Sequence, residues 1–426
     1  MLIRLVIMEK GLIMMAKELV QILGQRPAMT GSGIYLQALY NAAKSAGYKQ
    51  AVIGSAVEDG IYQDLDGIAR KDFYPVIFNS TRLPFAPFGM SDNMPYPSSQ
   101  YKDMSDDQKE KFLDGYFSRL EEVLKRLNNP VILTHHLWLL SAEISKKFKD
   151  LQVMAICHGT GIRQLRQNPG FSSEIKEGLN YADKIFALND EQKKMISKHF
   201  LIAPEKIKVT GLGYNSQYFS FPTDAKIKEK RDKAEVELIY VGKLSHSKGV
   251  NSLIRAIDQV DSRNLKVTFI GSGQGAEAQE IKERTYNLKH EVEFTGQISQ
   301  AEVAERMKLA DLLCLPSFYE GFALVILEAL ASGLRVVSSD LPGVKDKIPD
   351  YIKEAGTINF VELPELKDVD RPVESDLPAY EKRLAEAIRD QLGKINELDF
   401  LRDIKYIEAV RSLNWKSVFE MIEQEF

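Results

Sequence analysis

The chain has 426 residues, of which 44% are hydrophobic and 27% are charged, a composition typical of a globular protein with two or three domains. Its formal net charge of −4 argues against a protein whose main partner is nucleic acid, because phosphate binding needs a basic surface. The two cysteines, Cys157 and Cys314, lie in apolar runs and indicate reduced packing residues in a reducing compartment.

The first residues, 1–17, are expected to form an extension ahead of the first domain. Four charged residues between positions 9 and 18 interrupt the apolar run at the start of the chain, which is then too short to span a membrane as a helix. The run also lacks the small-residue cleavage site of a secretory signal. We therefore expect a cytoplasmic protein, and the lysines of residues 142–151 support only weak peripheral contact with a membrane.

Residues 18–215 are predicted to be the first domain. Short β-branched runs alternate there with longer amphipathic stretches, beginning with a strand over 18–24 and a helix that ends at Gly47. Strands that alternate with helices predict a parallel sheet with helices on both faces. Only residues 79–108, rich in proline and aromatic residues, break this rhythm. Such a long irregular segment is typical of a functional loop, and its aromatic side chains are candidates to contact a sugar or a lipid.

Residues 216–235 are polar and densely charged, and we expect them to form a linker. The alternation of strands and helices restarts after it and continues over residues 236–400, which predicts a second α/β domain. Residues 401–426 end in an amphipathic helix. The sequence therefore predicts two α/β domains in tandem.

Two glycine-rich loops follow predicted strands, where ligands of open parallel sheets bind. Gly31 and Gly33 directly precede a helix, so free helix amides and close backbone approach would suit an anion, and a tight loop with nothing bound explains them equally well. The run GSGQGA at 271–276 fits the dinucleotide fingerprint G-x-G-x-x-A. Its acidic partner, Glu293, lies inside a predicted strand and not at the tip, which weakens this interpretation.

A third loop, within residues 240–250, places two lysines between a predicted strand and a helix. Lys243 and Lys248 would suit a diphosphate as point charges at the carboxyl end of that strand. The alternative interpretation is a pair of solvated surface lysines.

Two glutamates eight positions apart follow another predicted strand. Glu320 belongs to the loop, and Glu328 lies about a turn and a half inside the next helix. A carboxylate in apolar surroundings needs a partner, and carboxylates accept paired hydrogen bonds from vicinal hydroxyls such as those of a ribose. The amides of Phe322, Ala323 and Leu324 would be unpaired donors for a phosphate or a sugar oxygen. A helix-dipole glutamate at 320 and a salt-bridged glutamate at 328 are the alternative.

These motifs together resemble the retaining glycosyltransferases of family 4. The spacing of Glu320 and Glu328 is similar to the E-x7-E signature of that family, and the lysine loop, VEFTGQISQAEV and LPGVKD occur in the expected order. The resemblance covers residues 18–426 and implies the GT-B fold, an α/β fold in which two Rossmann-like, doubly wound parallel-sheet domains face each other across a cleft. It also implies that the helices of residues 401–426 cross back toward the first domain.

The resemblance implies a donor site mainly in the second domain. Lys243 and Lys248 would hold the diphosphate of a UDP- or GDP-linked sugar, and Glu328 would hold the ribose hydroxyls. Glu320 would hold hydroxyls of the donor sugar. Four backbone amides would assist, and they belong to Gly321, Phe322, Ala323 and Leu324.

The resemblance also assigns roles in the first domain. Gly31 and Gly33 would close over the diphosphate, and His158, at a strand tip before a glycine, would contact the donor sugar near its reacting face. His135 and His136, at a similar tip, would line the acceptor side. The catalytic residues would be His158, Glu320 and Lys248, with no covalent nucleophile.

The implied reaction moves a hexosyl unit to a hydroxyl of a sugar, polyol or glycolipid, with retention of configuration and without a metal or cofactor. The six histidines and two cysteines show no metal-ligand spacing. A glycosyl phosphorylase, a sugar-phosphate synthase or a non-catalytic nucleotide-sugar-binding protein on the same fold remains open, as does a nicotinamide dehydrogenase built on GSGQGA. Lys243 in place of the usual arginine and Arg335 in place of the usual proline leave the donor unassigned.

Overall fold

The structure, a computed structural model, divides into two compact units, Met1–Gly211 with Val418–Phe426, and Leu212–Ser417. It describes residues 17–27, 29–63, 65, 67–91, 94–261, 264–320, 323–341, 343–368 and 370–426. The predicted N-terminal extension, 1–17, lies outside the described residues except for its last residue.

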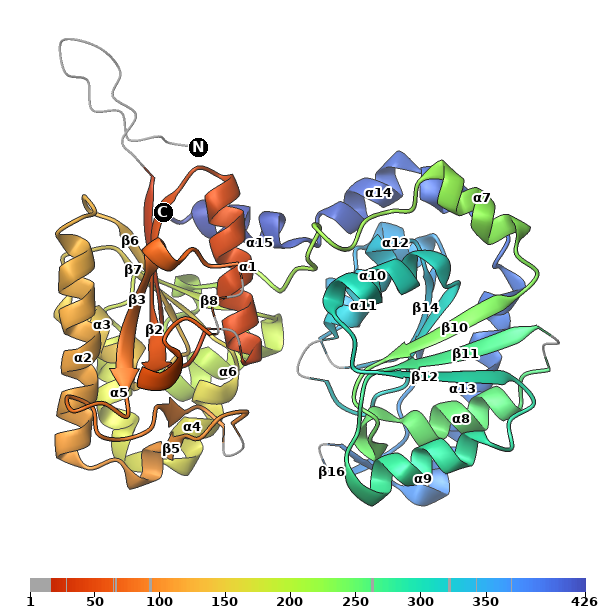
Figure 1. The fold of residues 1–426 in the computed structure, drawn as a ribbon, viewed down its shortest axis with the longest axis horizontal. Helices are drawn as coiled ribbons and strands as arrows, with labels where there is room; N and C mark the ends of the chain where they lie inside the picture. Colours follow the sequence, from red (N-terminus) through yellow and green to blue (C-terminus); the bar gives the residue numbers. More distant parts are fainter. Residues whose placement is uncertain are drawn as a thin grey trace, which may run out of the picture. The chain divides into compact units, whose positions relative to one another are not determined.

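The first unit is built on a seven-stranded parallel sheet with the order β3-β2-β1-β6-β7-β8-β9. Its strands are β1 (Glu18–Leu23), β2 (Lys49–Val57), β3 (Phe73–Phe78), β6 (Val131–His135), β7 (Val153–Ile156), β8 (Lys184–Ala187) and β9 (Ile207–Val209). Helices lie on both faces of the sheet (Figure 1), and they are α1 (Gly31–Ser45), α2 (Asp106–Leu124), α3 (Leu139–Lys147), α4 (Thr160–Gln167), α5 (Ser172–Leu179) and α6 (Asp190–Phe200). Strands covered on both faces need near-continuous apolar runs, which is the pattern of this half of the sequence.

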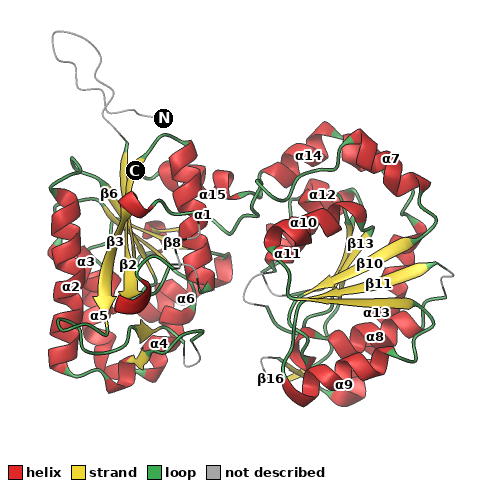
Figure 2. Ribbon diagram, viewed as in Figure 1, coloured by secondary structure: helices red, strands yellow, loops and turns green. Residues whose placement is uncertain are grey.

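The second unit repeats this plan with a six-stranded parallel sheet of the order β12-β11-β10-β13-β14-β15, which lies between layers of helices (Figure 2). Its strands are β10 (Val236–Val241), β11 (Leu265–Ile270), β12 (Glu291–Gly296), β13 (Leu312–Leu315), β14 (Arg335–Ser339) and β15 (Ile358–Val361). Its helices are α7 (Asp224–Asp232), α8 (Val250–Asp258), α9 (Gly275–Thr285), α10 (Gln300–Leu309), α11 (Leu324–Ala331), α12 (Asp350–Glu354), α13 (Leu377–Gly393) and α14 (Ile404–Arg411), followed by α15 (Trp415–Glu423). Two apolar clusters, one centred on α11 and one on α8 and α13, form its core.

In each sheet the strand order reverses beside the first strand of the unit. β2 and β3 lie on one side of β1 and β6 on the other, and β11 and β12 lie on one side of β10 and β13 on the other. The connections diverge at such a switch point and leave a crevice at the carboxyl ends of the two central strands. The loops after β1 and β6, and those after β10 and β13, are therefore where a ligand is expected.

Two predicted boundaries differ from the structure. The predicted linker, 216–235, contains α7, which begins after the N-cap Thr223 and buries Ile227 in a small apolar cluster. This helix carries one well-buried apolar residue among many charges, so the sequence shows no helical periodicity there. In the last segment, 401–426, only Val418–Phe426 belongs to the first unit, and the residues before it remain with the second.

The predicted irregular segment, 79–108, is packed onto the first unit in its described part. It contains a short parallel pair, β4 (Phe88–Gly89) with β5 (Ser99–Gln100). Phe88 and Tyr101 are buried in the core of the unit, and the ring of Tyr101 packs edge-on against Trp138 with centroids 5.6 Å apart. These two rings therefore belong to the core of the first unit and stabilise it.

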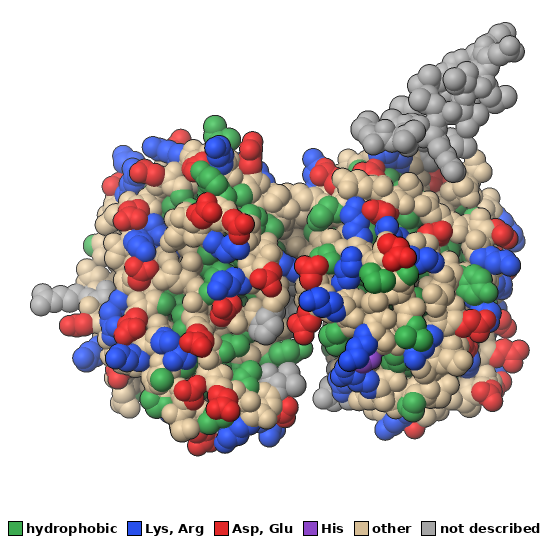
Figure 3. Space-filling model, turned by 180° about the vertical axis from the view of Figure 1, so that it is seen from behind, with side chains coloured by type: hydrophobic (Ala, Val, Ile, Leu, Met, Phe, Trp, Pro, Cys, Tyr) green, Lys and Arg blue, Asp and Glu red, His purple; other side chains and the backbone are tan. Residues whose placement is uncertain are grey.

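The described residues include no helix that is both long enough and apolar enough to cross a membrane. On the face of the molecule in Figure 3, lysine and arginine side chains are interspersed with aspartate and glutamate. That face therefore carries no continuous basic stripe of the kind that tracks a nucleic acid backbone.

Candidate active site

The glycine loop after β1 leads into α1 through an N-cap. Thr30 Oγ1 accepts the amide hydrogen of Gly33 at 3.2 Å, and the first intrahelical hydrogen bond runs from Ile34 to Thr30. A Cβ on Gly31 would meet no atom of the described residues within 4 Å, and its φ is not in the left-handed region. The fold itself therefore does not require glycine at 31, and the position is open to the close approach of a ligand.

Three histidines meet beside the switch point of the first unit. His135 Nδ1 lies 3.0 Å from His158 Nε2 with the two rings nearly parallel, and the ring centroids of His136 and His158 are 4.9 Å apart. The structure thus brings together the three histidines that the sequence singled out at separate strand tips. In the part of the chain that the structure describes, no group of three or more His, Cys, Asp or Glu side chains is arranged to hold a metal ion.

These imidazoles are neutral at physiological pH. His135 and His136 are 2% and 5% exposed, and burial lowers the pKa of each to about 3. Burial also lowers the pKa of His158 well below its usual value, and its two histidine neighbours add to the effect. Neutral imidazoles act as hydrogen-bond donors and acceptors and not as cations. Burial of His135 and His136 does not fit the predicted direct contact with an acceptor.

Sequence patterns did not single out the two glutamines that hold these histidines. Gln21, in β1, places Oε1 3.3 Å from His135 Nε2, and Gln25, just beyond β1, places Oε1 3.0 Å from His136 Nε2. A signal for them is present in the sequence, because an amide in an otherwise apolar strand must find a buried partner.

In the second unit, an ion pair joins the loop after β10 to the loop after β13. Lys248 Nζ lies 2.8 Å from Glu320 Oε2 and also donates to the carbonyl oxygen of Tyr319 at 3.2 Å. Ser317 Oγ donates to Glu320 Oε1 at 2.7 Å, so both oxygens of the carboxylate are hydrogen-bonded. The pair is half-buried, whereas Lys243 on the same loop is exposed. Two predicted site residues, Lys248 and Glu320, are therefore in direct contact.

Glu328 lies in the second turn of α11. Gln300 Nε2, at the start of α10, donates to Glu328 Oε1 at 3.2 Å. Burial raises the pKa of Glu328 to about 7, and the hydrogen bond from Gln300 opposes this rise. A carboxylate with one neutral donor keeps lone pairs for further donors, so this side chain is suited to accept hydroxyl groups.

The helix that carries Glu328 begins later than predicted. Ala323 is its N-cap and Leu324 its first residue, and no side chain caps it. The amides of these two residues belong to the start of the helix, where no side chain accepts them. Gly321 and Phe322 lie outside the described residues.

Two glycines allow close backbone contacts between the loops at the carboxyl end of the second sheet. Gly249 has φ +66°, and a Cβ there would overlap the carbonyl oxygen of Pro316. Gly271 has φ +134°, and a Cβ there would overlap the carbonyl oxygen of Gly242. The first glycine of GSGQGA therefore serves packing against the lysine loop, which removes its main support for a dinucleotide site.

Arg335, which stands where the resembling family usually has proline, has a structural role. This residue is the first of β14. It therefore lies at the amino end of the strands, whereas the loops just described lie at the carboxyl end. Its guanidinium donates to the carbonyl oxygens of Gly356 (3.3 Å) and Glu397 (2.9 Å) and to Gln391 Oε1 (3.1 Å). Arginine at this position therefore carries no information on the donor.

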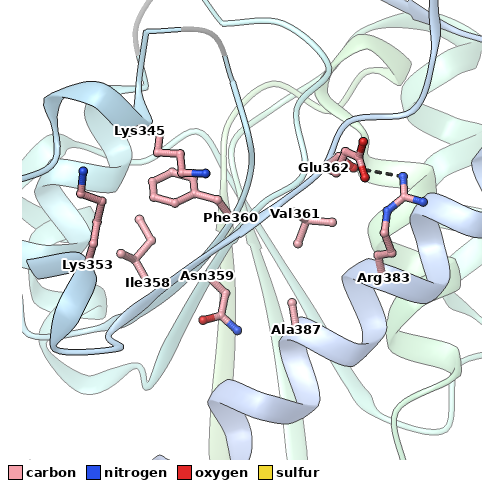
Figure 4. A pocket seen from close by; sticks show the side chains of 9 residues that line it. All are labelled: Lys345, Lys353, Ile358, Asn359, Phe360, Val361, Glu362, Arg383 and Ala387. Carbon is pink, nitrogen blue, oxygen red and sulfur yellow. Dashed lines mark hydrogen bonds between the residues drawn. The ribbon is translucent and has the colours of Figure 1, made fainter. Parts of the chain in front are cut away.

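A separate pocket of about 380 Å³ lies beside the edge strand β15 (Figure 4). Lys345 and Lys353 each form an ion pair with an aspartate, at 3.2 and 2.6 Å, and Arg383 Nη2 donates to the carbonyl oxygen of Glu362 at 3.2 Å. The two lysines and Arg383 lie on opposite sides of the strand in Figure 4. The cations of this pocket are thus engaged and do not converge on one ligand position.

The fold is shared with solved glycosyltransferases. A glycosyltransferase of Rickettsia africae ESF-5 matches with a TM-score of 0.65 and 16% identity, over 96% of this chain and 97% of that chain. The HepE protein of Anabaena, solved in complex with UDP, matches with a TM-score of 0.63 and 15% identity, over 96% and 98%. These likenesses and the two parallel-sheet units define the GT-B fold, as the sequence predicted.

Residues 222–362 match the family model of the glycosyl transferases group 1. The segment contains all four charged residues predicted for the donor site, Lys243, Lys248, Glu320 and Glu328. The predicted resemblance to glycosyltransferases is thereby confirmed at the level of the glycosyl transferases group 1.

Characterised and uncharacterised relatives agree with this assignment. An uncharacterized glycosyltransferase of Methanocaldococcus jannaschii is 30% identical over 172 residues, 39% of this chain and 44% of that protein. The N-acetyl-α-D-glucosaminyl L-malate synthase of Bacillus anthracis is 27% identical over 253 residues, 56% and 63% of the two chains. A D-inositol 3-phosphate glycosyltransferase of Corynebacterium diphtheriae is 24% identical over 51% and 57%. The chain thus spans about half the length of the curated relatives that it matches.

Proposed function

We propose that the protein is a retaining glycosyltransferase of family 4, which moves a hexosyl unit from a UDP- or GDP-linked sugar to a hydroxyl group of a sugar, polyol or glycolipid. The observation that carries this proposal is the ion pair of Lys248 with Glu320, eight positions before Glu328, within the family domain. A hydrogen-bonded carboxylate beside a cation and a second carboxylate with spare lone pairs provide acceptors for the hydroxyls of a donor.

The second unit would bind the donor. Lys243 and Lys248 would neutralise the diphosphate as point charges, and Glu328 would accept the ribose hydroxyls. Glu320 would accept hydroxyls of the donor sugar, assisted by the amides of Ala323 and Leu324 and by those of Gly321 and Phe322. Structural neighbours support this donor class, because one is a complex with UDP and another is a complex with UDP and glucose.

The first unit would supply the groups that complete the site. The open backbone at Gly31 and the adjacent turn at Gly33 would approach the diphosphate, and His158 would contact the donor sugar. Because His158 is neutral, it would act there as a hydrogen-bonding group and not as a positive charge. His135 and His136 would act through His158 and Thr160 and not on the acceptor itself.

The charge that develops on the leaving diphosphate would be stabilised by the two lysines and the start of α11, a form of electrostatic catalysis. Front-face attack, in which the departing phosphate helps to deprotonate the acceptor, would retain the configuration. No residue is assigned as a covalent nucleophile, and the proposed reaction needs no metal.

A pocket of about 460 Å³ in the first unit is our candidate for acceptor contacts. It lies where the 79–108 segment meets α4, and side-chain amides dominate its lining. The lining residues are Gly89, Ser91, Gln100, Tyr101, Lys102, Gln164, Gln167 and Asn168. Amides pair with hydroxyl groups as both donors and acceptors, which suits a polyhydroxylated acceptor.

We place the reaction in the cytoplasm. Cys157 and Cys314 are both free and buried, as expected of packing residues in a reducing compartment.

The first test is a thermal-shift titration with UDP, GDP, ADP and NAD as separate ligands. A nucleoside diphosphate at 100 times its dissociation constant should stabilise the protein by about 2.7 kcal/mol, which a melting curve resolves. Glu328→Ala should lose most of this shift, whereas Lys345→Ala, which changes the separate pocket beside β15, should keep it. A shift with NAD alone, or equal shifts for Glu328→Ala and wild type, would overturn the proposal.

A further inference from the structure

Two buried glutamines stand at the carboxyl end of β1 in an otherwise apolar setting. Gln21 is 0% exposed and Gln25 is 2% exposed. A buried amide that lacks partners is destabilising, so each is expected to belong to a fully bonded network. Gln21 belongs to a chain of hydrogen bonds that ends at His158, and the direction of every bond in that chain can be worked out.

The chain is anchored at a backbone carbonyl, which can only accept. Gln50 Nε2 donates to the carbonyl oxygen of Tyr40 at 2.9 Å, so Gln50 Oε1 is the atom that faces Gln21. Gln21 must therefore present Nε2 to Gln50, at 3.5 Å, and Oε1 to His135. The orientation of both amides follows from a single fixed acceptor.

The amide orientation then fixes two imidazoles. Gln21 Oε1 can only accept, so the His135 nitrogen that faces it, Nε2 at 3.3 Å, carries the hydrogen. In a neutral ring the other nitrogen is then an acceptor. His135 Nδ1 accordingly accepts from His158 Nε2 at 3.0 Å, and the hydrogen of His158 resides on Nε2.

We propose that Gln21 is a positioning residue for His158: acting through His135, it holds His158 as the Nε2–H tautomer and leaves Nδ1 as the acceptor nitrogen of that ring. A histidine held in this way accepts a hydrogen bond from a substrate hydroxyl and does not deliver a proton to it. The tautomer itself follows from the hydrogen bonds alone. The inference that Nδ1 accepts a hydrogen bond from a hydroxyl of a donor sugar rests on the proposed function.

A second series of hydrogen bonds, through Gln25 and His136, provides a matched control. His136 Nε2 lies 3.0 Å from Gln25 Oε1, and Thr160 Oγ1 lies 3.0 Å from His136 Nδ1. Ser32 Oγ donates to the same Gln25 oxygen at 3.0 Å. This chain joins the glycine loop to the start of α4 and makes no hydrogen bond to His158. Loss of Gln25 should therefore disturb His136 and leave the tautomer of His158 in place.

The burial of the histidines supports neutral rings along the series of hydrogen bonds from Gln21 to His158. His135 is buried, and His158, though partly exposed, has a pKa well below its usual value because of burial and of the neighbouring imidazoles. A neutral pair of rings shares one hydrogen across the 3.0 Å contact without repulsion, whereas two protonated rings would present two donors to each other.

The test uses the full-length protein labelled with 15N at its six histidines. Nuclear magnetic resonance distinguishes protonated from unprotonated ring nitrogens, and the signals are assigned with His135→Asn and His158→Asn. We expect wild-type His158 to be protonated at Nε2 and unprotonated at Nδ1. In Gln21→Met, which keeps the length of the side chain and removes the amide, both His135 and His158 should shift toward a mixture of tautomers. In Gln25→Met, only His136 should shift.

Wild-type His158 protonated at Nδ1 would overturn the proposal, and so would a Gln21→Met spectrum in which His158 keeps its wild-type signals. If Gln21→Met does not fold, Gln50→Met removes the anchor that orients Gln21 and should produce the same direction of change. These readouts do not depend on the reaction. Failure of the nucleoside diphosphate titration would therefore reject the proposed function and leave the tautomer result intact.

Discussion

The two switch-point sites of this protein occupy the same place in similar sheets and are built from opposite materials. In the first unit, buried neutral imidazoles and amides are linked by hydrogen bonds from Gln21 to His158. In the second unit, Lys248 and Glu320 form a half-buried ion pair. Neutral buried networks fix orientation and keep their protonation state in the folded protein near neutral pH, whereas ion pairs near the surface weaken as salt is added. The topology therefore determines where a site lies. The side chains determine whether the site orients neutral groups by hydrogen bonds or presents charged groups.

Removal of the Lys248–Glu320 ion pair should have the largest effect on activity. Glu320→Ala removes the carboxylate partner of Lys248 and the acceptor of Ser317, so Lys248 is held only by the carbonyl oxygen of Tyr319. We expect the turnover number to fall about 100-fold, in the range found when one group that stabilises developing charge is removed, with smaller change in nucleotide affinity. The measurement is steady-state transfer or hydrolysis of the donor identified by the thermal-shift screen.

Asp340→Ala is the matched control for that experiment, because it breaks an ion pair of similar length, 3.2 Å to Lys345, on the same unit and beside a different pocket. Its turnover should remain near that of wild type, since exposed ion pairs contribute little. Equal turnover of the two variants would show that the Lys248–Glu320 pair is an ordinary surface contact.

The second prediction tests whether only the second site titrates near neutral pH. The folded state raises the pKa of Glu328 from 4.5 to about 7, so ionisation of this group destabilises the folded protein, and its contribution to the free energy of unfolding falls as pH rises from 4.5 through 7. Glu328→Gln removes this loss. We expect the variant to be more stable than wild type by about 2 kcal/mol at pH 8 and nearly equal to it at pH 5, as measured by urea unfolding.

Glu305→Gln on α10 serves as its control. The neighbouring Lys308 lowers the pKa of Glu305, so neutralising that carboxylate should not stabilise the protein at pH 8. Burial lowers the pKa of His135 and His136 to about 3, so both groups add stability as pH rises from 5 through about 6.5, but they do so equally in Glu328→Gln and in wild type and cancel in the comparison. A gain for Glu328→Gln that is the same at both pH values would contradict the assigned cause.

The smallest effect is expected at the glycine loop of the first unit. Gly31→Ala adds a methyl group into open space, so the melting temperature should be unchanged. If a diphosphate approaches the backbone there, its affinity should weaken about tenfold, equivalent to about 1.4 kcal/mol. Isothermal titration with the nucleoside diphosphate measures this change. Gly249→Ala, whose added carbon would overlap Pro316, should instead lose stability. Unchanged affinity in Gly31→Ala would remove the first unit from the diphosphate site.

Much of the fold was readable from the sequence because its signals are local. The alternation of apolar runs and amphipathic stretches identified the parallel sheets, and Glu320 and Glu328 lie in the segment that matches the glycosyl transferases group 1. Helix α7 was missed because a helix with few apolar residues among many charges has no periodic signal. The packing of the segment 79–108 could not be predicted, because the sequence does not show that Phe88 and Tyr101 are buried.

The hydrogen-bond chains of the first unit could not be predicted, since they join residues far apart in the sequence. His135 is 114 positions from Gln21, and the amide orientation depends on the carbonyl oxygen of Tyr40 on a third element. The role of the glycine at 271 was ambiguous in the sequence for a related reason. Its role is a close approach to Gly242 on a neighbouring loop, and a fingerprint of spacing cannot distinguish that from the approach of a dinucleotide.

The glycine contacts at the carboxyl edge of the second sheet have a consequence for the thermodynamics of recognition. Gly249 lies against Pro316 and Gly271 against Gly242, so three loops are already ordered with respect to one another before any ligand arrives. A preorganised backbone loses little conformational entropy on association, and the remaining entropic loss falls on exposed side chains such as Lys243. Substitutions of those side chains should then change affinity through charge and shape, while the loops that carry them keep their conformation.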